Sequence, residues 1–252
     1  MTDAQAPQNA QPRVPDGRRV YAVGDVHGRL DLLEQLLARI ENDAARHPAR
    51  SVGLIFLGDY VDRGPDSRGV VARLAAGPPA SGPLAGAGWT CLKGNHEDCL
   101  IRFLDETHLG RAWCRNGGLE TVRSYAGNSL PEGVENDMAA LQLILSQAMP
   151  PAHVRFLARL PLTHREGDYL FVHAGIRPGV ALEDQEPSDL LWIRDDFLFD
   201  SRPLGVTVVH GHTPVPAPEI RANRIGIDTA AYRSGALTAL VLEGSDMKFL
   251  IS

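Results

Sequence analysis

The sequence predicts an α/β domain in which short buried strands alternate with helices. Apolar runs of strand length, such as residues 52–58, recur along the chain, and segments with apolar residues at helical spacing separate them. The chain has 252 residues, of which 44% are hydrophobic and 22% are charged. This length and composition are typical of one large globular domain with a substantial core.

The first half of the chain supplies three predicted strands, each followed by a helix or a turn. The strands span residues 19–24, 52–58 and 90–94, and the helices span 30–45 and 69–76, with a third beginning at 97. The helix over 30–45 is predicted from apolar residues that fall on one face: Leu30, Leu33, Leu37, Ile40 and Ala44. Residues 77–88 are rich in Gly, Pro and Ala and are predicted to form a loop.

The second half begins with a helical stretch and returns to strands. Residues 105–159 are predicted to be mostly helical, with breaks at 117–118, 127–128 and 150–151, where Gly, Asn or Pro interrupts the pattern. Further strands are expected at residues 169–173, 206–210, 225–228 and 237–242, with an edge strand at 247–251. The sequence therefore predicts one catalytic domain over residues 18–252, a helical insert within it, and no internal repeat.

Composition excludes several classes of protein. Residues 1–17 lack the apolar core of a secretory signal and are expected to form a flexible leader that adds nothing to the fold. The chain has 3 cysteines and a net charge of -6. No apolar run reaches transmembrane length, and no disulfide framework is indicated, so a cytoplasmic location is expected. An acidic chain gives no reason to expect a nucleic-acid or membrane partner.

Polar motifs follow five of the predicted strands directly. They occupy residues 24–28 (GDVHG), 58–64 (GDYVDRG), 94–97 (GNHE), 173–175 (HAG) and 210–213 (HGHT). Because the carboxyl ends of strands in open α/β sheets meet at one edge, these motifs are expected to lie together. Each has an ordinary explanation as a turn or a helix cap, but 5 of the 9 histidines fall in them.

Carboxylate, carboxamide and imidazole groups at one edge indicate a metal site. This ligand set suits Mn²⁺, Fe and Zn²⁺. A pair of metal ions needs a bridging ligand, and Asp59 is the candidate because it lies between the other ligand pairs in the sequence. The remaining histidines, His47, His108, His153 and His164, lie in helical or turn stretches and are expected to have no such role.

On these motifs the sequence resembles the metallo-dependent phosphoprotein phosphatases of the calcineurin-like phosphoesterase superfamily, in particular their bacterial and phage members. All five motifs occur in the family's order, and the resemblance covers residues 19–242. It implies a β-sandwich flanked by helices, two divalent metal ions and hydrolysis of phosphoserine or phosphothreonine. Mn²⁺ is the ion that the resemblance favours, with Fe or Zn²⁺ as the other possibilities.

The resemblance also implies roles for individual residues. Asp25 and His27 resemble ligands of the first metal, Asp59 the shared ligand, and Asn95, His173 and His212 the ligands of the second. His96 resembles the acid that protonates the leaving group, and Asp62 the carboxylate that orients it. Arg63, Arg194, Asn95 and Tyr232 are the implied substrate-binding residues, and His210 is left out of the metal set. Hydroxide between the two metals would then attack phosphorus.

Two other functions remain open. Relatives that hydrolyse dinucleoside polyphosphates or nucleotides share the metal motifs, although the sequence YVDR at residues 60–63 favours the protein phosphatases. A non-catalytic phosphate-binding protein would be expected to lack a ligand or His96, and none is missing. The sequence leaves the physiological substrate and the oligomeric state open. No P-loop, dinucleotide-binding, zinc-protease or cysteine-phosphatase motif occurs.

Overall fold

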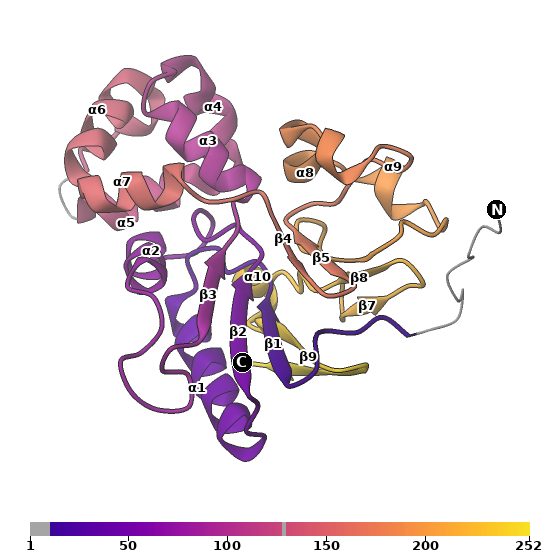
Figure 1. Ribbon diagram of the computed structural model, residues 1–252. Coiled ribbons are helices and arrows are strands. Elements are labelled where there is room, and N and C mark those ends of the chain that lie inside the picture. Colours follow the sequence, from indigo (N-terminus) through magenta and orange to yellow (C-terminus); the bar gives the residue numbers. More distant parts are fainter. Residues whose placement is uncertain (1–10, 128–129) are drawn as a thin grey trace.

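The computed structural model describes residues 11–127 and 130–252 (Figure 1). In this part of the chain the strands form two five-stranded sheets. The first sheet runs, in spatial order, β10 (Asp246–Ile251), β9 (Thr238–Glu243), β1 (Arg18–Val23), β2 (Ser51–Phe56) and β3 (Gly88–Cys91). The second runs β4 (Thr163–Glu166), β5 (Tyr169–Val172), β6 (Thr207–His210), β8 (Arg224–Gly226) and β7 (Glu219–Ile220).

The two sheets pack face to face, and the side chains of β1 point alternately into the core between the sheets and into the core beneath the helices. Val20 and Ala22 join the core between the sheets, together with Phe171 of the second sheet. Tyr21 and Val23, on the opposite face of the strand, join the core beneath the helices. The predicted sandwich flanked by helices is thus confirmed.

Helices cover the outer face of each sheet. The helices α1 (Leu30–Arg46) and α2 (Ser67–Ala75) join the core on the outer face of the first sheet. The helices α8 (Pro187–Trp192) and α9 (Asp195–Leu198) contribute to the outer core of the second. A single turn of helix, α10 (Ala231–Ser234), precedes β9. In the described part of the chain no helix is long and apolar enough to cross a membrane.

The helical insert begins where β3 ends, and Figure 1 shows it as a cluster of helices at that end of the first sheet. Its helices are α3 (Asn95–Phe103), α4 (Gly110–Trp113), α5 (Leu119–Ala126), α6 (Met138–Ala148) and α7 (Pro151–Ala158). Short turns at Thr107–Leu109 and Val134–Asn136 and a π-helical turn at Cys114–Gly118 connect them. The predicted break at 117–118 coincides with Gly117, whose φ is 105°. Position 128 of the second predicted break lies outside the described residues.

The expectation that the amino-terminal segment adds nothing to the fold does not hold for residues 12–14. Val14 is fully buried in the core between the sheets. Its backbone N–H donates to the Gly244 carbonyl at 3.0 Å, while the Arg13 carbonyl accepts from the Asp168 N–H at 3.0 Å. Residues 12–14, which we call the amino-terminal strap, therefore join the turn after β9 to the turn after β4. Residues 1–10 of the predicted leader lie outside the described part of the chain.

Candidate metal centre

The post-strand motifs meet because both sheets contain parallel strands. Strands β1, β2 and β3 are parallel to one another in the first sheet, and β5, β6 and β8 are parallel in the second. Their carboxyl ends therefore deliver loops to one region between the two sheets. The contact between Asp25 and His212 illustrates this, since the His212 N–H donates to Asp25 Oδ2 at 3.0 Å from the other sheet.

Four ligand-type atoms converge around Asn95. Its Oδ1 lies 2.8 Å from His173 Nε2 and 2.9 Å from His212 Nδ1. His173 Nε2 in turn lies 3.4 Å from Asp59 Oδ1. Ligands about 2.1 Å from one metal ion sit about 3.0–3.4 Å from their neighbours; the spacing between His173 and Asp59 falls in this range and the two Asn95 spacings are slightly shorter, so the four atoms are placed to hold a single ion.

A second group of atoms forms on the other side of Asp59. Its Oδ2 lies 3.5 Å from His27 Nε2, while its Oδ1 faces His173. Asp25 Oδ1 is buried and has no hydrogen-bond partner among the described residues, so it is an acceptor that a cation would satisfy. The two oxygens of Asp59 thus point to two different groups, which is one arrangement by which a carboxylate can serve two cations. The residues fit a pair of divalent cations.

Hydrogen bonds on the outer nitrogens prepare two of the histidines as ligands. His27 Nδ1 lies 2.9 Å from the Val61 carbonyl, and His173 Nδ1 lies 2.9 Å from the Leu57 carbonyl. Each Nδ1 must carry the hydrogen, which leaves the Nε2 lone pair facing the centre. Burial lowers the pKa of His27 to about 3, so the neutral ring that a metal needs is the stable form.

Negative charge accumulates where the cations would lie. Burial, followed by the charges of Asp228 and Asp59, raises the pKa of Asp25 well above its ordinary value. Burial also raises the pKa of Asp228 to about 6, and this residue had no place in the predicted site. Bound cations would remove this repulsion.

His96 and Asp62 form a close pair beside the ligands. His96 Nδ1 lies 2.6 Å from Asp62 Oδ2, and both side chains are buried. His96, His27 and Asp59 also have the spacing of a metal site. However, although burial opposes the charged form, Asp59 and the Asp62 hydrogen bond raise the pKa of His96 to about 9. A protonated ring is a poor ligand and a good acid, which fits the role that the resemblance implies.

Arg63 reaches across the centre from the loop after β2. Its Nη1 donates to His27 Nε2 at 3.0 Å. Its Nη2 lies 3.1 Å from His96 Nε2, so the charge of Arg63 opposes the protonation of His96, although the pKa of that ring is still raised. The guanidinium also stacks over the ring of Tyr232, 4.9 Å from its centroid, and that ring lies edge-on to His27. Arg63, Arg194, Asn95 and Asp59 line one pocket of about 160 Å³, so both predicted arginines lie beside the candidate metal centre.

The backbone at the centre is held in an unusual conformation. Among residues 11–127 and 130–252, six non-glycine residues have positive φ: His27, Asp59, Asp62, Arg63, His212 and Ala230. Five of the six are predicted site residues. Left-handed backbone is unfavourable for side chains with a Cβ, and its concentration here is typical of a functional site.

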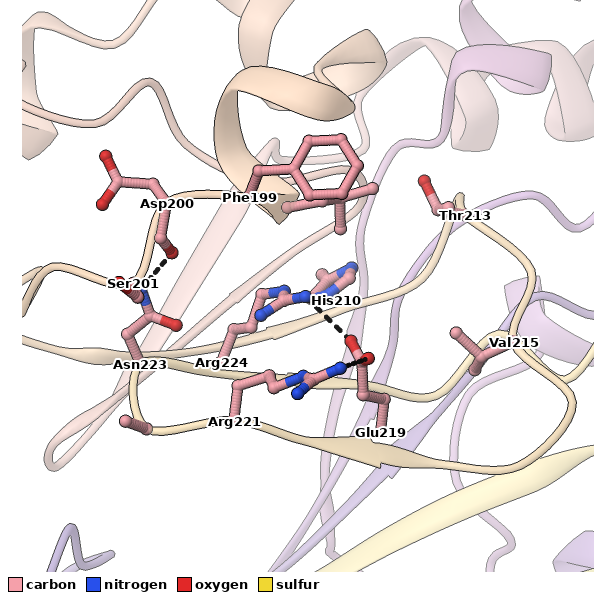
Figure 2. A pocket seen from close by; sticks show the side chains of 12 residues that line it. Phe199, Asp200, Ser201, His210, Thr213, Val215, Glu219, Arg221, Asn223 and Arg224 are labelled. Carbon is pink, nitrogen blue, oxygen red and sulfur yellow. Dashed lines mark hydrogen bonds and ion pairs between the residues drawn. The ribbon is translucent and has the colours of Figure 1, made fainter.

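His210, which the predicted metal set omits, lines a different pocket from Asp59, Asn95 and His212. Figure 2 shows it in a separate pocket, near Glu219, Arg221 and Arg224. This pocket has a volume of about 610 Å³. His210 packs edge-on against Phe197, with ring centroids 5.2 Å apart, and burial lowers its pKa to about 4.

Glu97, which has no role in the predicted site, fixes the loop that carries Asp59. The two oxygens of its buried carboxylate accept hydrogen bonds from the N–H groups of Asp59 at 2.8 Å, Tyr60 at 2.7 Å and Gly94 at 2.9 Å. Glu97 lies three residues after Gly94, which is the spacing of a helix capping box. This spacing is the feature of the sequence from which a structural role for Glu97 could have been predicted.

Several known proteins are similar to this chain over most of its length. A bis(5'-nucleosyl)-tetraphosphatase PrpE from Bacillus cereus is 30% identical over 244 residues, covering 86% of this chain and 88% of the relative. Serine/threonine-protein phosphatase 1 from Salmonella typhimurium is 29% identical over 231 residues, covering 88% and 90%. A metallophosphoesterase structure from Sphaerobacter thermophilus superimposes with a TM-score of 0.53 at 19% identity, covering 93% of this chain and 87% of that one.

The sandwich and the paired ligand groups define a metal-dependent phosphoesterase. Residues 18–236 match the calcineurin-like phosphoesterase family, and the chain belongs to that family.

Proposed function

We propose that the chain hydrolyses phosphate monoesters, and that its substrates are phosphoserine and phosphothreonine in proteins. The observation that carries this proposal is the buried His96–Asp62 pair beside the metal centre. A serine or threonine alkoxide is a poor leaving group and needs a proton, and a histidine held protonated by a carboxylate is placed to supply it. Serine/threonine-protein phosphatase 1 is among the relatives.

Each residue has a part in the proposed reaction. Asp25, His27, Asp59, Asn95, His173 and His212 would hold two divalent cations, for which we propose Mn²⁺. Such cations supply Lewis acidity, which activates water and draws charge from the phosphoryl oxygens. Arg63 and Arg194 would bind the remaining phosphoryl oxygens through charge-assisted hydrogen bonds. His96 would then give its proton to the departing oxygen.

A second candidate is hydrolysis of dinucleoside polyphosphates. It is favoured by the PrpE relatives, which match this chain as closely as the protein phosphatase does. The metal ligands and both arginines would serve that reaction without change. The two candidates differ in the leaving group, because a nucleotide phosphate leaves with little need for a proton.

One assay separates the candidates. Metal-stripped protein is offered a phosphoserine peptide and diadenosine tetraphosphate side by side, with and without Mn²⁺, and both phosphate and nucleotide products are measured. Mn²⁺-dependent release of phosphate from the peptide supports the first candidate. Preference for the dinucleotide selects the second, and failure to turn over either substrate would contradict both.

Replacing the acid tests the proposed mechanism. His96→Asn is expected to lower kcat on the phosphoserine peptide by about 10²–10⁴-fold while the metal content stays that of the wild type. Steady-state kinetics and elemental analysis of the same preparation check both statements. Full activity of this variant on the peptide would show that His96 is not the acid. His108→Asn, an exposed histidine of the insert, is the control and should leave kcat unchanged.

A further inference from the structure

The carboxylate of Asp62 is held by residues that lie more than fifty positions further along the chain. The indole Nε1–H of Trp113 donates to Asp62 Oδ2 at 2.7 Å, and the Thr121 hydroxyl donates to Asp62 Oδ1 at 2.6 Å. Asp62 and Thr121 are fully buried and Trp113 nearly so. Together with His96 Nδ1, these groups give the carboxylate three donors and leave it no contact with water.

The donor assignments around Thr121 are mutually consistent. Its hydroxyl accepts from the Asp62 N–H at 2.8 Å while donating to Asp62 Oδ1. Ser67 Oγ lies 3.0 Å from Thr121 Oγ1 and also accepts from the Asp62 N–H at 3.0 Å, so the serine donates to the threonine. Both the backbone and the side chain of Asp62 are therefore fixed by one buried network.

Trp113 and Thr121 belong to the helical insert, which supplies further contacts to the same loop. The Gly117 carbonyl accepts from the Arg63 N–H at 3.1 Å. Gly117 has a φ of 105°, and a Cβ at Gly118 would overlap the Trp113 ring. The turn between α4 and α5 is thus shaped to bring the indole N–H to Asp62 and a carbonyl to Arg63.

We infer that Trp113 and Thr121 are positioning residues of the catalytic acid: they fix the Asp62 carboxylate so that Oδ2 is aimed at His96 Nδ1. The inference rests on the proposed function, since it requires His96 to protonate the leaving group. Without these donors the carboxylate can rotate, and the His96 ring loses its fixed direction toward the substrate. The insert then contributes to the chemistry through Asp62 and His96, although Trp113 and Thr121 themselves contact no substrate atom.

The test compares two aryl phosphates whose leaving groups need a proton to different degrees. Phenol has a pKa of about 10, whereas p-nitrophenol ionises near neutral pH and leaves almost unaided. Trp113→Phe and Thr121→Val are expected to lower kcat for phenyl phosphate about tenfold, with little change for p-nitrophenyl phosphate, in KM or in metal content. Thr121→Ser keeps the hydroxyl, so its kcat for phenyl phosphate should stay close to that of the wild type.

Two controls separate positioning from general damage to the fold. Trp89→Phe removes an indole N–H that donates to the Leu74 carbonyl at 3.0 Å, away from the metal centre, and should leave the ratio of the two rates unchanged. In a His96→Asn background, Trp113→Phe should cause no further loss, because the group that it positions is absent.

The possible results are distinguishable. Equal losses on both substrates, or a further loss in the His96→Asn background, would overturn the inference and leave His96 as the acid. If His96→Asn lowered kcat by the same factor on phenyl phosphate and on p-nitrophenyl phosphate, His96 would not be the acid, and the inference would fall with it. A selective loss on phenyl phosphate that disappears in the double variant supports both.

Discussion

Asp59 is the residue at which the two groups of ligand atoms meet. One of its oxygens faces His173 and the other faces His27. Although burial opposes ionisation, the charged forms of the surrounding histidines lower the pKa of Asp59, and His96 is the one among them whose own pKa is raised. A charged group shared between two cation sites makes each site depend on the other.

Asp59→Asn should therefore lose both metal ions together with activity. The amide retains one oxygen acceptor, but it has no negative charge and replaces the second oxygen with a donor. Elemental analysis of the purified variant is expected to find less than about one tenth of the wild-type metal content at equal free Mn²⁺. Asp246→Asn, at the exposed start of β10, is the control. Retention of one ion per chain would show that the sites fill independently.

At the scale of elements, a buried charged cluster ties β1 to α1 and β10. Asp43 of α1 accepts hydrogen bonds from Arg19 at 2.6 Å and Tyr21 at 2.8 Å, and it also pairs with Lys248. Burial alone would raise the pKa of Asp43, but the hydrogen bonds from Lys248, Arg19 and Tyr21 lower it to about 2.

This cluster predicts a pH dependence of stability. A carboxyl group whose pKa is lower in the folded chain stabilises it above the unfolded value, near 4, and that contribution is lost as the pH falls toward 2. Asp43→Asn should cost about 2 kcal/mol in the free energy of unfolding at pH 7, and the difference from wild type should shrink at pH 2–3. Urea unfolding at both pH values measures it. A constant difference would exclude Asp43 as the titrating group, and the exposed Asp184→Asn serves as the reference.

The elements also show where sequence reasoning succeeds and where it ends. Buried strands such as β1 and β2 were predicted to within two residues, because apolar runs of that length have few alternatives. Strand β4 (THRE) was missed because its residues are polar and only partly buried, and β7 because it has two residues. The predicted ligands came together through their motifs. The contacts of Trp113 and Thr121 with Asp62 could not be predicted, since no spacing rule links positions so far apart.

At the scale of the whole molecule, the metal centre lies on the seam between two sheets. Asp25, Asp59 and Asn95 follow strands of the first sheet, whereas His173 and His212 follow strands of the second. Neither sheet carries a complete set of ligands. The separation between the sheets must therefore be set by the shared core and by the amino-terminal strap, which bonds to a turn of each sheet.

The strap gives a prediction about the whole fold. Val14→Ala should lower the free energy of unfolding by about 2 kcal/mol, because two methyl groups leave the fully buried core between the sheets. Leu143→Ala, on an exposed position of α6, should change it by less than about 0.5 kcal/mol. Denaturant titration of both variants checks the difference. Equal stability of the two variants would mean that the strap does not hold the sheets together.

The left-handed backbone at the metal centre has an evolutionary consequence. Each of His27, Asp59, Asp62, Arg63 and His212 would hold its backbone conformation more easily as glycine, by about 1 kcal/mol per position. Glycine at any of them would remove a site residue. Glycine at Asp62 would also leave the buried donors of Trp113 and Thr121 without an acceptor, at a cost that exceeds the strain relieved, so the chain keeps the strained backbone together with the side chains that it presents.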